Sequence, residues 1–242
     1  MFQLCSNKKF NYGAYQEYYL IPKEVVRINM FKIPNGITFE EAAQLEPFYC
    51  AVFGAALSNI EFGDTVAILG AGAQGLYFLK LAKLVGASRV IMMDYFTYRL
   101  DYVKKLGVDE VVNNRSEDGN ERLRELTDVR GAEVVIVAAG APTAWEDAVK
   151  MAARGDLVNK YAGCTPGSTL TIPTERIHYD MVKIIGTYHT TPECVHRAWH
   201  LIKTRAVDLR PIVTHRMPLD AIQKAFELLA TSKEAIKIAI LP

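Results

Sequence analysis

A G-x-G-x-x-G pattern spans Gly70–Gly75, directly after the β-branched, apolar run Thr65–Leu69. Glycines at this spacing allow a tight turn, a close approach of the backbone to a pyrophosphate, and close packing of the next helix on the sheet. Free N–H groups and the positive dipole at the start of that helix can bind phosphate oxygens. The pattern predicts a dinucleotide-binding site, and the alternative is a glycine turn in an unrelated α/β protein. The candidate residues are Gly70, Gly72, Ala73, Gln74 and Gly75.

An acidic residue, Asp94, ends the next apolar run, Arg89–Met93. It lies about twenty residues past the glycines, where a carboxylate accepts hydrogen bonds from both ribose hydroxyls of a dinucleotide. The 2′-phosphate of NADP would place negative charge against Asp94, and no arginine follows directly to compensate. The sequence therefore predicts NAD rather than NADP.

The middle of the chain alternates strand-like and helix-like segments. Six strands are expected, of which the second ends at Met93. The other five are expected near Thr65–Leu69, Glu110–Asn113, Ala132–Ala139, Leu157–Gly163 and Lys183–Tyr188. Helices are expected over about Gln74–Val85, Thr97–Leu106, Asn120–Thr127 and Thr143–Ala153. Consecutive βαβ units predict an α/β fold with a doubly wound parallel sheet, whose ligands lie at the carboxyl ends of the strands. Small residues at such ends, Ala139, Ala162 and Gly163, are candidates for cofactor contact. The alternative is that they only mark the transition from strand to loop.

The flanks of this region predict a second, discontinuous domain. We expect residues 47–189 to form the NAD-binding domain, and residues 1–46 with 190–242 to form part of another. Asp220 is expected to cap a helix whose apolar face carries Ile222, Phe226 and Leu229. The other elements expected here are a strand at Ala14–Ile21, a helical run from Thr38, a helix at Cys194–Thr204, and strands at Ile212–Arg216 and Ala235–Leu241.

Composition narrows the class of protein. The chain has 28 basic and 27 acidic residues and a formal charge of +1, so its composition shows no electrostatic footprint for nucleic acid or an anionic membrane, and neither is expected as a partner. The longest apolar run, Phe48–Leu57, is too short to cross a bilayer, and a cytoplasmic location is expected. The four cysteines show no C-x-x-C spacing and are expected to be free thiols.

Several motifs together resemble the medium-chain zinc-dependent dehydrogenases, particularly the sorbitol and threonine dehydrogenase branch. They are Gly13–Tyr18, Phe39–Ala43, Glu46–Pro47, Gly63–Val66, Gly70–Gly75, Asp94, Pro211–Leu219 and Ala225–Phe226. The resemblance covers essentially the full chain, with Gln16 in place of the usual alanine. It implies a Rossmann domain plus part of a GroES-like, β-rich catalytic domain. It also implies NAD-dependent hydride transfer to or from a polyol or secondary alcohol whose oxygen is polarised by zinc.

Zinc catalysis needs three protein ligands and an open position. In the resembled family, a cysteine and a His-Glu pair that supply ligands lie upstream of the segment similar to Met1 onward. We therefore expect an N-terminally truncated chain, with Cys5 near the end of the family's structural zinc lobe, and zinc binding only in a complete chain. The resemblance makes Glu46 the one candidate for a catalytic and metal-ligating residue. Its alternative interpretation is an acidic residue that the helix dipole stabilises.

The resemblance assigns further residues to the cofactor and substrate region. Arg99 matches a basic residue that approaches the adenosine ribose, and its alternative is a solvated arginine on a helix. Thr187, Tyr188 and His189 follow Gly186 at the end of the last strand, in the segment that in the family meets the nicotinamide and substrate. Tyr188 could instead pack without ligand contact. A homodimer or homotetramer through the sheet edge is expected by analogy, at Lys183–Tyr188 or Thr169–Ile172.

Two other functions stay open. A non-catalytic dinucleotide-binding protein is favoured if the chain is complete without zinc ligands. A zinc-free reductase of the same superfamily, acting on enones or quinones, is disfavoured by Asp94 and Glu46–Pro47. The pair His196 and His200 has Arg197 where a metalloprotease needs glutamate, so a solvated helix face is the better interpretation.

Overall fold

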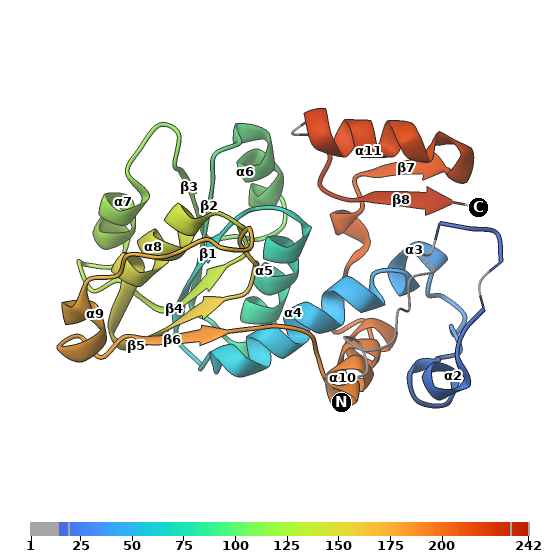
Figure 1. The fold of residues 1–242 in the computed structure, drawn as a ribbon, viewed down its shortest axis with the longest axis horizontal. Helices are drawn as coiled ribbons and strands as arrows, with labels where there is room; N and C mark the ends of the chain where they lie inside the picture. Colours follow the sequence, from blue (N-terminus) through green and yellow to red (C-terminus); the bar gives the residue numbers. More distant parts are fainter. Residues whose placement is uncertain (1–14, 19, 233, 242) are drawn as a thin grey trace.

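The computed structural model describes residues 15–18, 20–232 and 234–241. Its main feature is a six-stranded parallel sheet with strand order β3-β2-β1-β4-β5-β6. The strands are β1 (Thr65–Leu69), β2 (Arg89–Asp94), β3 (Glu110–Asn113), β4 (Ala132–Val137), β5 (Ala152–Lys160) and β6 (Lys183–Gly186). This arrangement confirms the predicted doubly wound α/β sheet (Figure 1). The strand order reverses between β1 and β4, where such sheets bind ligands.

Helices cover both faces of this sheet. Alternate residues of β1 point to opposite sides, so Val66 and Ile68 belong to one apolar cluster and Ala67 and Leu69 to the other. The first face is covered by α4 (Leu45–Ser58), α5 (Ala73–Val85), α6 (Thr97–Lys104) and α10 (Pro192–Lys203). The second is covered by α7 (Gly119–Leu126) and α8 (Pro142–Met151). Burial on both sides explains why the central strands are almost continuously apolar.

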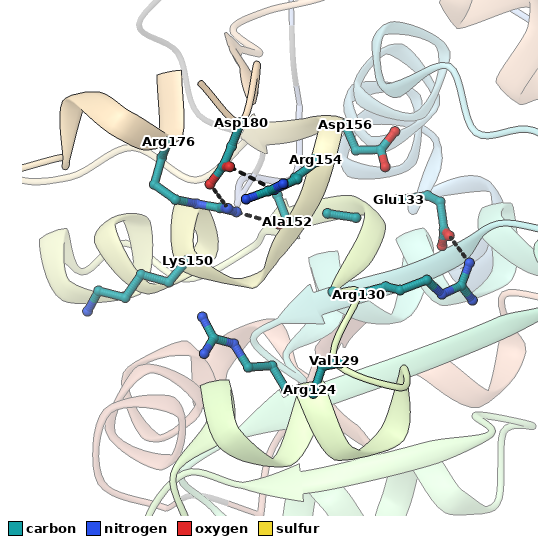
Figure 2. Close-up of a pocket in the computed structure, with 12 residues that line it drawn as sticks. Arg124, Val129, Arg130, Glu133, Lys150, Ala152, Arg154, Asp156, Arg176 and Asp180 are labelled. Carbon is teal, nitrogen blue, oxygen red and sulfur yellow. Dashed lines mark hydrogen bonds and ion pairs between the residues drawn. The ribbon is translucent and has the colours of Figure 1, made fainter. Parts of the chain in front are cut away.

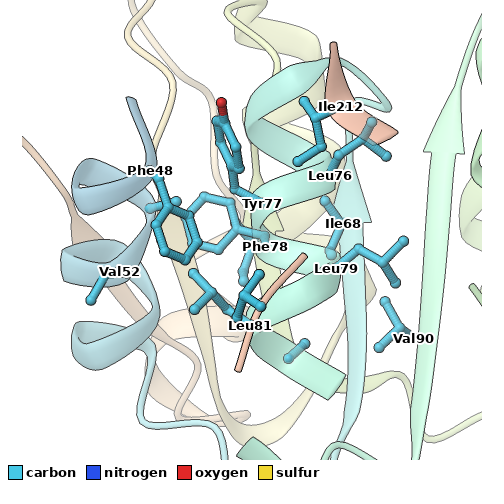
Figure 3. Close-up of a cluster of buried hydrophobic side chains, with 14 of the residues drawn as sticks. Phe48, Val52, Ile68, Leu76, Tyr77, Phe78, Leu79, Leu81, Val90 and Ile212 are labelled. Atoms are coloured by element: carbon cyan, nitrogen blue, oxygen red, sulfur yellow. The ribbon is translucent and has the colours of Figure 1, made fainter. Parts of the chain in front are cut away.

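The first face holds the aromatic part of the core, shown in Figure 3. Phe48 on α4 packs against Tyr77 on α5, with ring centroids 5.6 Å apart, and both side chains are fully buried. A Cβ at Gly54 would lie 2.7 Å from the Phe78 ring, so glycine lets α4 approach α5 closely. Burying each such ring stabilises the fold by about 1.5–3 kcal/mol.

The flanking segments contain a second, small sheet. Strands β7 (His215–Pro218) and β8 (Ile238–Leu241) pair in parallel beneath α11 (Ile222–Thr231), at the upper right of Figure 1. Among the described residues, this two-stranded sheet is all that the structure shows of the predicted β-rich second domain. The remaining elements are α2 (Lys23–Asn29), α3 (Phe39–Ala42), α9 (Thr174–His178) and the 3-10 turns η1 (Arg210–Ile212) and η2 (Leu219–Ala221).

Several predicted elements in the flanks are wrong or displaced. The described residues of the predicted strand Ala14–Ile21 form no strand, because none of them has a ladder partner. Asp220 lies inside η2, and α11 begins after Ala221 without a side-chain cap. The buried residue of α11 is Ala225, whereas Phe226 is exposed and lies edge-on to Tyr15.

Element ends also differ from the sequence-based expectation. The predicted helix Thr143–Ala153 ends at Met151, and β5 begins at Ala152 rather than Leu157. Ile212 belongs to η1, and the predicted strand there begins at His215. The segment Thr169–Ile172 is not a strand, while β6 does form an edge of the large sheet. No helix among the described residues is long and apolar enough to span a bilayer.

Ion pairs join the N-terminal flank to the segments after α10. Glu40 accepts two hydrogen bonds of 2.6 Å from the guanidinium of Arg216. The buried carboxylate of Glu41 pairs with Arg205 and completes a capping box with Thr38 at the start of α3. These contacts hold α3, and with it the start of α4, against the C-terminal third of the chain.

Candidate functional site

The turn after β1 requires glycine at its first position. Gly70 has a φ of +110°, and its N–H donates to the carbonyl of Met93 over 2.8 Å. A Cβ at this residue would lie 2.9 Å from the carbonyl oxygen of Ala138, which follows the adjacent strand β4. The turn is therefore pressed against the β4 loop at the point where the strand order reverses.

Gly75 and Gly72 are glycines for different reasons. A Cβ at Gly75 would lie 1.9 Å from the carbonyl oxygen of Gly70, so the close packing of α5 excludes any side chain. At Gly72 the nearest atom to a Cβ would be Nη1 of Arg99, 4.0 Å away. Gly72 caps α5 without a side-chain hydrogen bond, and the first-turn N–H groups of a helix have no intrahelical partner. Internal packing thus does not require Gly72, and the space before these N–H groups suits an anion.

Asp94 is fixed beside this loop. Its side chain is 7% exposed, Oδ2 accepts the N–H of Ala71 at 2.8 Å, and Oδ1 accepts the N–H of Phe96 at 3.0 Å. Nη1 of Arg99 lies 3.6 Å from Oδ2. The carboxylate is therefore held at the carboxyl end of β2 by two backbone donors and one guanidinium.

Arg99 retains unused hydrogen-bonding capacity. Its guanidinium lies over the ring of Phe96, with Cζ 5.3 Å from the ring centroid, and its side chain is 25% exposed. The Nε atom is buried without a hydrogen-bond partner among the described residues. A buried donor of this kind beside an open glycine cradle fits a site that a polar ligand completes.

The loops after the other strands lie along the same edge. The N–H of Ala138 donates to Leu69 and the N–H of Ala162 to Val137, each over 2.8 Å. A Cβ at Gly140 would lie 2.7 Å from the carbonyl oxygen of Gly163, so these two loops touch. The structure thus brings the predicted residues Ala139, Ala162 and Gly163 to the edge that carries the glycine turn.

The residues after β6 differ in how they face this edge. The Thr187 hydroxyl donates to Asn159 over 2.8 Å inside the protein. Tyr188 is 76% exposed, and its ring centroid lies 3.9 Å from that of His189. His189 has a φ of +61°, a conformation that costs energy for a residue other than glycine and recurs at functional sites.

Glu46 lies in the first turn of α4 and is exposed. The thiol of Cys50, one turn later, donates to Glu46 Oε1 over 3.9 Å, and burial together with this carboxylate raises the pKa of Cys50 to about 12. Burial, with a contribution from the Glu46 charge, also raises the pKa of Tyr161. The Tyr161 hydroxyl donates to the Gln74 side chain over 2.8 Å, which connects the surroundings of Glu46 to the glycine loop.

The described residues do not form a zinc site. They contain no group of three histidine, cysteine, aspartate or glutamate side chains placed to hold a metal ion, whereas a catalytic zinc needs three protein ligands. His196 instead lies 3.2 Å from the carbonyl of Ile28 and edge-on to Phe31. Cys5 and Gly13 lie outside the described residues. The described side chains alone therefore do not supply the ligands of a catalytic zinc.

Two buried polar residues near the site were missed from the sequence. Asn159 is fully buried and donates to the Gly54 carbonyl and the Ser58 hydroxyl, which holds α4 on β5. Lys160 is 5% exposed, donates to the carbonyl of Trp145, and has its pKa lowered by burial to about 8. The sequence could have indicated both residues, because they lie in a strand that is covered on both faces, where any polar side chain must be buried.

Comparisons with known proteins bear directly on this arrangement. The family model described as zinc-binding dehydrogenase matches residues 73–204, more than half of the chain. The chain belongs to the zinc-binding medium-chain dehydrogenase family. It is 33% identical over 222 residues to an L-threonine 3-dehydrogenase of Yersinia pestis, covering 91% of this chain but 63% of that relative. The chain thus spans less than two thirds of the length of the curated relatives it matches.

Solved structures agree with this family assignment. A putative zinc-binding dehydrogenase from Sinorhizobium meliloti 1021, bound to NADP, superposes with a TM-score of 0.81 at 27% identity, covering 88% of this chain and 62% of that one. A short chain alcohol dehydrogenase from Escherichia coli CFT073, complexed with NADH, superposes with a TM-score of 0.78 at 20% identity, covering 86% and 61%. The second likeness concerns the fold alone.

Proposed function

We propose that this chain binds NAD(H) and belongs to an NAD-dependent, zinc-type oxidoreductase that transfers a hydride between NAD and a polyol or secondary alcohol. The observation that carries the cofactor proposal is the open position at Gly72, in front of the uncapped start of α5 and beside the fixed carboxylate of Asp94. The nicotinamide, when bound, supplies the hydride acceptor. Family membership and the similarity to an L-threonine 3-dehydrogenase support the reaction class.

Each group at the edge has a separate role in this proposal. Backbone N–H groups after Gly72 bind the pyrophosphate, and Gly70 and Gly75 hold the turn close enough for that contact. Asp94 accepts hydrogen bonds from the adenosine ribose, with Arg99 beside it. The Ala139, Ala162 and Gly163 loops leave space for the cofactor, and Thr187 and Tyr188 lie where the nicotinamide half would end. Glu46 is proposed as the residue of this chain that faces the metal in the complete catalytic site.

The preference for NAD follows from charge. The Asp94 carboxylate is buried and held by backbone donors, so it cannot turn away from a ligand at little cost. A ribose hydroxyl can donate to it, whereas a 2′-phosphate would be repelled. Arg99 lies 3.6 Å from Asp94 and reduces that repulsion without removing it.

The cofactor proposal is tested by substituting Gly72→Asp and titrating NADH by fluorescence. The position has room for a side chain, so the fold should survive, while a carboxylate in front of α5 should weaken NADH binding at least about tenfold. Gln223→Asp, which adds the same charge at an exposed residue of α11, is the matched control and should leave binding unchanged. Equal affinity for both variants and the parent would contradict the proposal.

A second candidate is a protein that binds the dinucleotide without oxidoreductase activity. The observation that favours it is that the described residues contain no group of three metal ligands. The two functions separate in one experiment on the protein isolated from its own cells. Zinc content together with NAD-dependent oxidation of a secondary alcohol favours the dehydrogenase, and NADH binding with neither property favours the second candidate.

A further inference from the structure

A cleft of about 540 Å³ opens at the amino edge of the large sheet, opposite the proposed dinucleotide site. Its position follows from its lining, which comes from residues that precede or begin β4 and β5 and from Asp180, which precedes β6. The glycine turn and Asp94 lie instead at the carboxyl ends of the strands. A ligand in this cleft would therefore not compete with the cofactor.

Charged side chains dominate the cleft (Figure 2). Five cations outnumber three carboxylates there, although the chain as a unit carries a charge of only +1. The cations are Arg124, Arg130, Lys150, Arg154 and Arg176, and the carboxylates are Glu133, Asp156 and Asp180. The cleft is thus a local concentration of positive charge on a nearly neutral protein.

Two of these arginines are already used by the fold. Asp180 pairs with Arg176 at 2.5 Å and with Arg154 at 2.9 Å. Arg176 also donates to the carbonyl of Val149 over 2.9 and 3.1 Å, which satisfies the end of α8. These residues build one wall of the cleft, and Asp180 balances one of the two guanidinium charges.

Arg130 pairs with Glu133 at 3.9 Å. Arg124 and Lys150 are then the cations left for a ligand. The side chain of Arg124, at the end of α7, has no ion pair or hydrogen bond among the described residues. Lys150, at the end of α8, pairs with Asp147 at 2.8 Å, but both side chains are partly exposed, and such a pair is weak. Figure 2 shows the two side chains extending from separate helices into the same space.

The rim of the cleft is conformationally strained. Asp128 and Val129 both have positive φ, +50° and +61°, which is unusual for a β-branched residue. Val129 is 79% exposed, and its N–H donates to the carbonyl of Arg124 over 2.7 Å. Backbone strain of this kind clusters at ligand sites, and here it places an apolar side chain in the lining of the cleft, close to the backbone of Arg124.

We infer that this cleft binds a small polyanion, with phosphate or carboxylate groups held by Arg124 and Lys150. Guanidinium and ammonium groups form charge-assisted hydrogen bonds to both kinds of oxyanion. The cleft volume falls within the range of small-molecule sites, and the exposed Val129 offers apolar contact to the ligand's carbon skeleton. A ligand at this edge contacts the chain between α7 and α8, away from the hydride-transfer site.

The test is calorimetric titration of the chain with sodium pyrophosphate and, separately, sodium citrate at low ionic strength. We expect one site for at least one of these probes; pyrophosphate alone would assign a phosphate ligand, and citrate alone a polycarboxylate. Arg124→Gln and Lys150→Gln should each weaken binding about tenfold or more. The matched controls are Arg27→Gln and Lys203→Gln, which remove exposed cations from the last turns of α2 and α10.

Pyrophosphate could also bind the glycine loop, so the titration is repeated on Gly72→Asp. Retention of the site in that variant, with loss in Arg124→Gln, supports the inference whether or not the dinucleotide proposal holds. Three results would overturn it: no binding of either probe, equal weakening by the control substitutions, or loss of binding only in Gly72→Asp.

Discussion

The carboxylate of Asp94 accepts a hydrogen bond from the backbone N–H of Ala71 over 2.8 Å, which joins the end of β2 to the glycine turn after β1. One side chain therefore both shapes the turn and defines the charge beside it. Because Asp94 is buried, this charge is fixed in position before any ligand binds. The pair explains how two sequence motifs separated along the chain form one site.

Asp94→Ala should weaken NADH binding about tenfold or more and reduce the preference for NADH over NADPH, because the ribose loses a charged acceptor. Titration with both cofactors measures the change. Asp109→Ala is the matched control, since Asp109 accepts the N–H of Val90 at the other end of β2. That control should lower stability while leaving cofactor discrimination unchanged; equal discrimination in the Asp94 variant and the parent would contradict the assignment.

Substitution of Gly75 and of Gly72 should affect stability differently, because packing requires glycine only at Gly75. Gly75→Ala places a methyl group 1.9 Å from the Gly70 carbonyl oxygen and should lower the free energy of unfolding by about 3 kcal/mol or prevent folding. Gly72→Ala adds its methyl group to open space and should change the free energy of unfolding by less than about 1 kcal/mol. Urea denaturation compares the two variants, and similar losses would contradict the tight packing at Gly75 and the open space at Gly72.

The ion pair between Glu41 and Arg205 should contribute to stability. Arg205→Ala leaves the buried Glu41 carboxylate with only the hydrogen bonds that it accepts from the N–H and hydroxyl of Thr38, and should cost about 1–2 kcal/mol. Arg197→Ala removes an exposed pair with Glu193 on α10 and should cost less than about 0.5 kcal/mol. If both substitutions have the same effect on urea unfolding, the pair does not join the flanks as described.

Lys160 should make stability depend on pH. Burial lowers its pKa from 10.5 to about 8, so the unfolded chain holds the proton more tightly than the folded one between these values. The native state is therefore penalised fully below pH 8, and the penalty is relieved as the pH rises toward 10.5. Relative to Lys160→Met, the parent should gain about 2–3 kcal/mol between pH 7 and pH 10. A difference that stays constant with pH would contradict burial of the ammonium group.

The sequence predicted the large sheet well because its strands are apolar on both faces and are separated by helices of ordinary length. It predicted the glycine turn and Asp94 because their chemistry fixes their spacing. The strand expected at Ala14–Ile21 is not formed by its described residues, because a Tyr-rich segment becomes a strand only where another strand pairs with it. The prediction that Asp220 caps a helix was wrong because Asp220 lies in a 3-10 turn, and α11 begins only after that turn. The pairing of Arg205 with Glu41 depends on tertiary contacts and left no local signal.

The central claim is that the edge carrying Gly72 and Asp94 binds NAD(H), and the most direct measurement is an equilibrium titration of the unmodified chain with NADH and, in parallel, NADPH. The structure leads us to expect saturable binding of one NADH per chain, with NADPH binding more weakly because its 2′-phosphate meets Asp94. Binding of neither cofactor, or tighter binding of NADPH, would contradict the account.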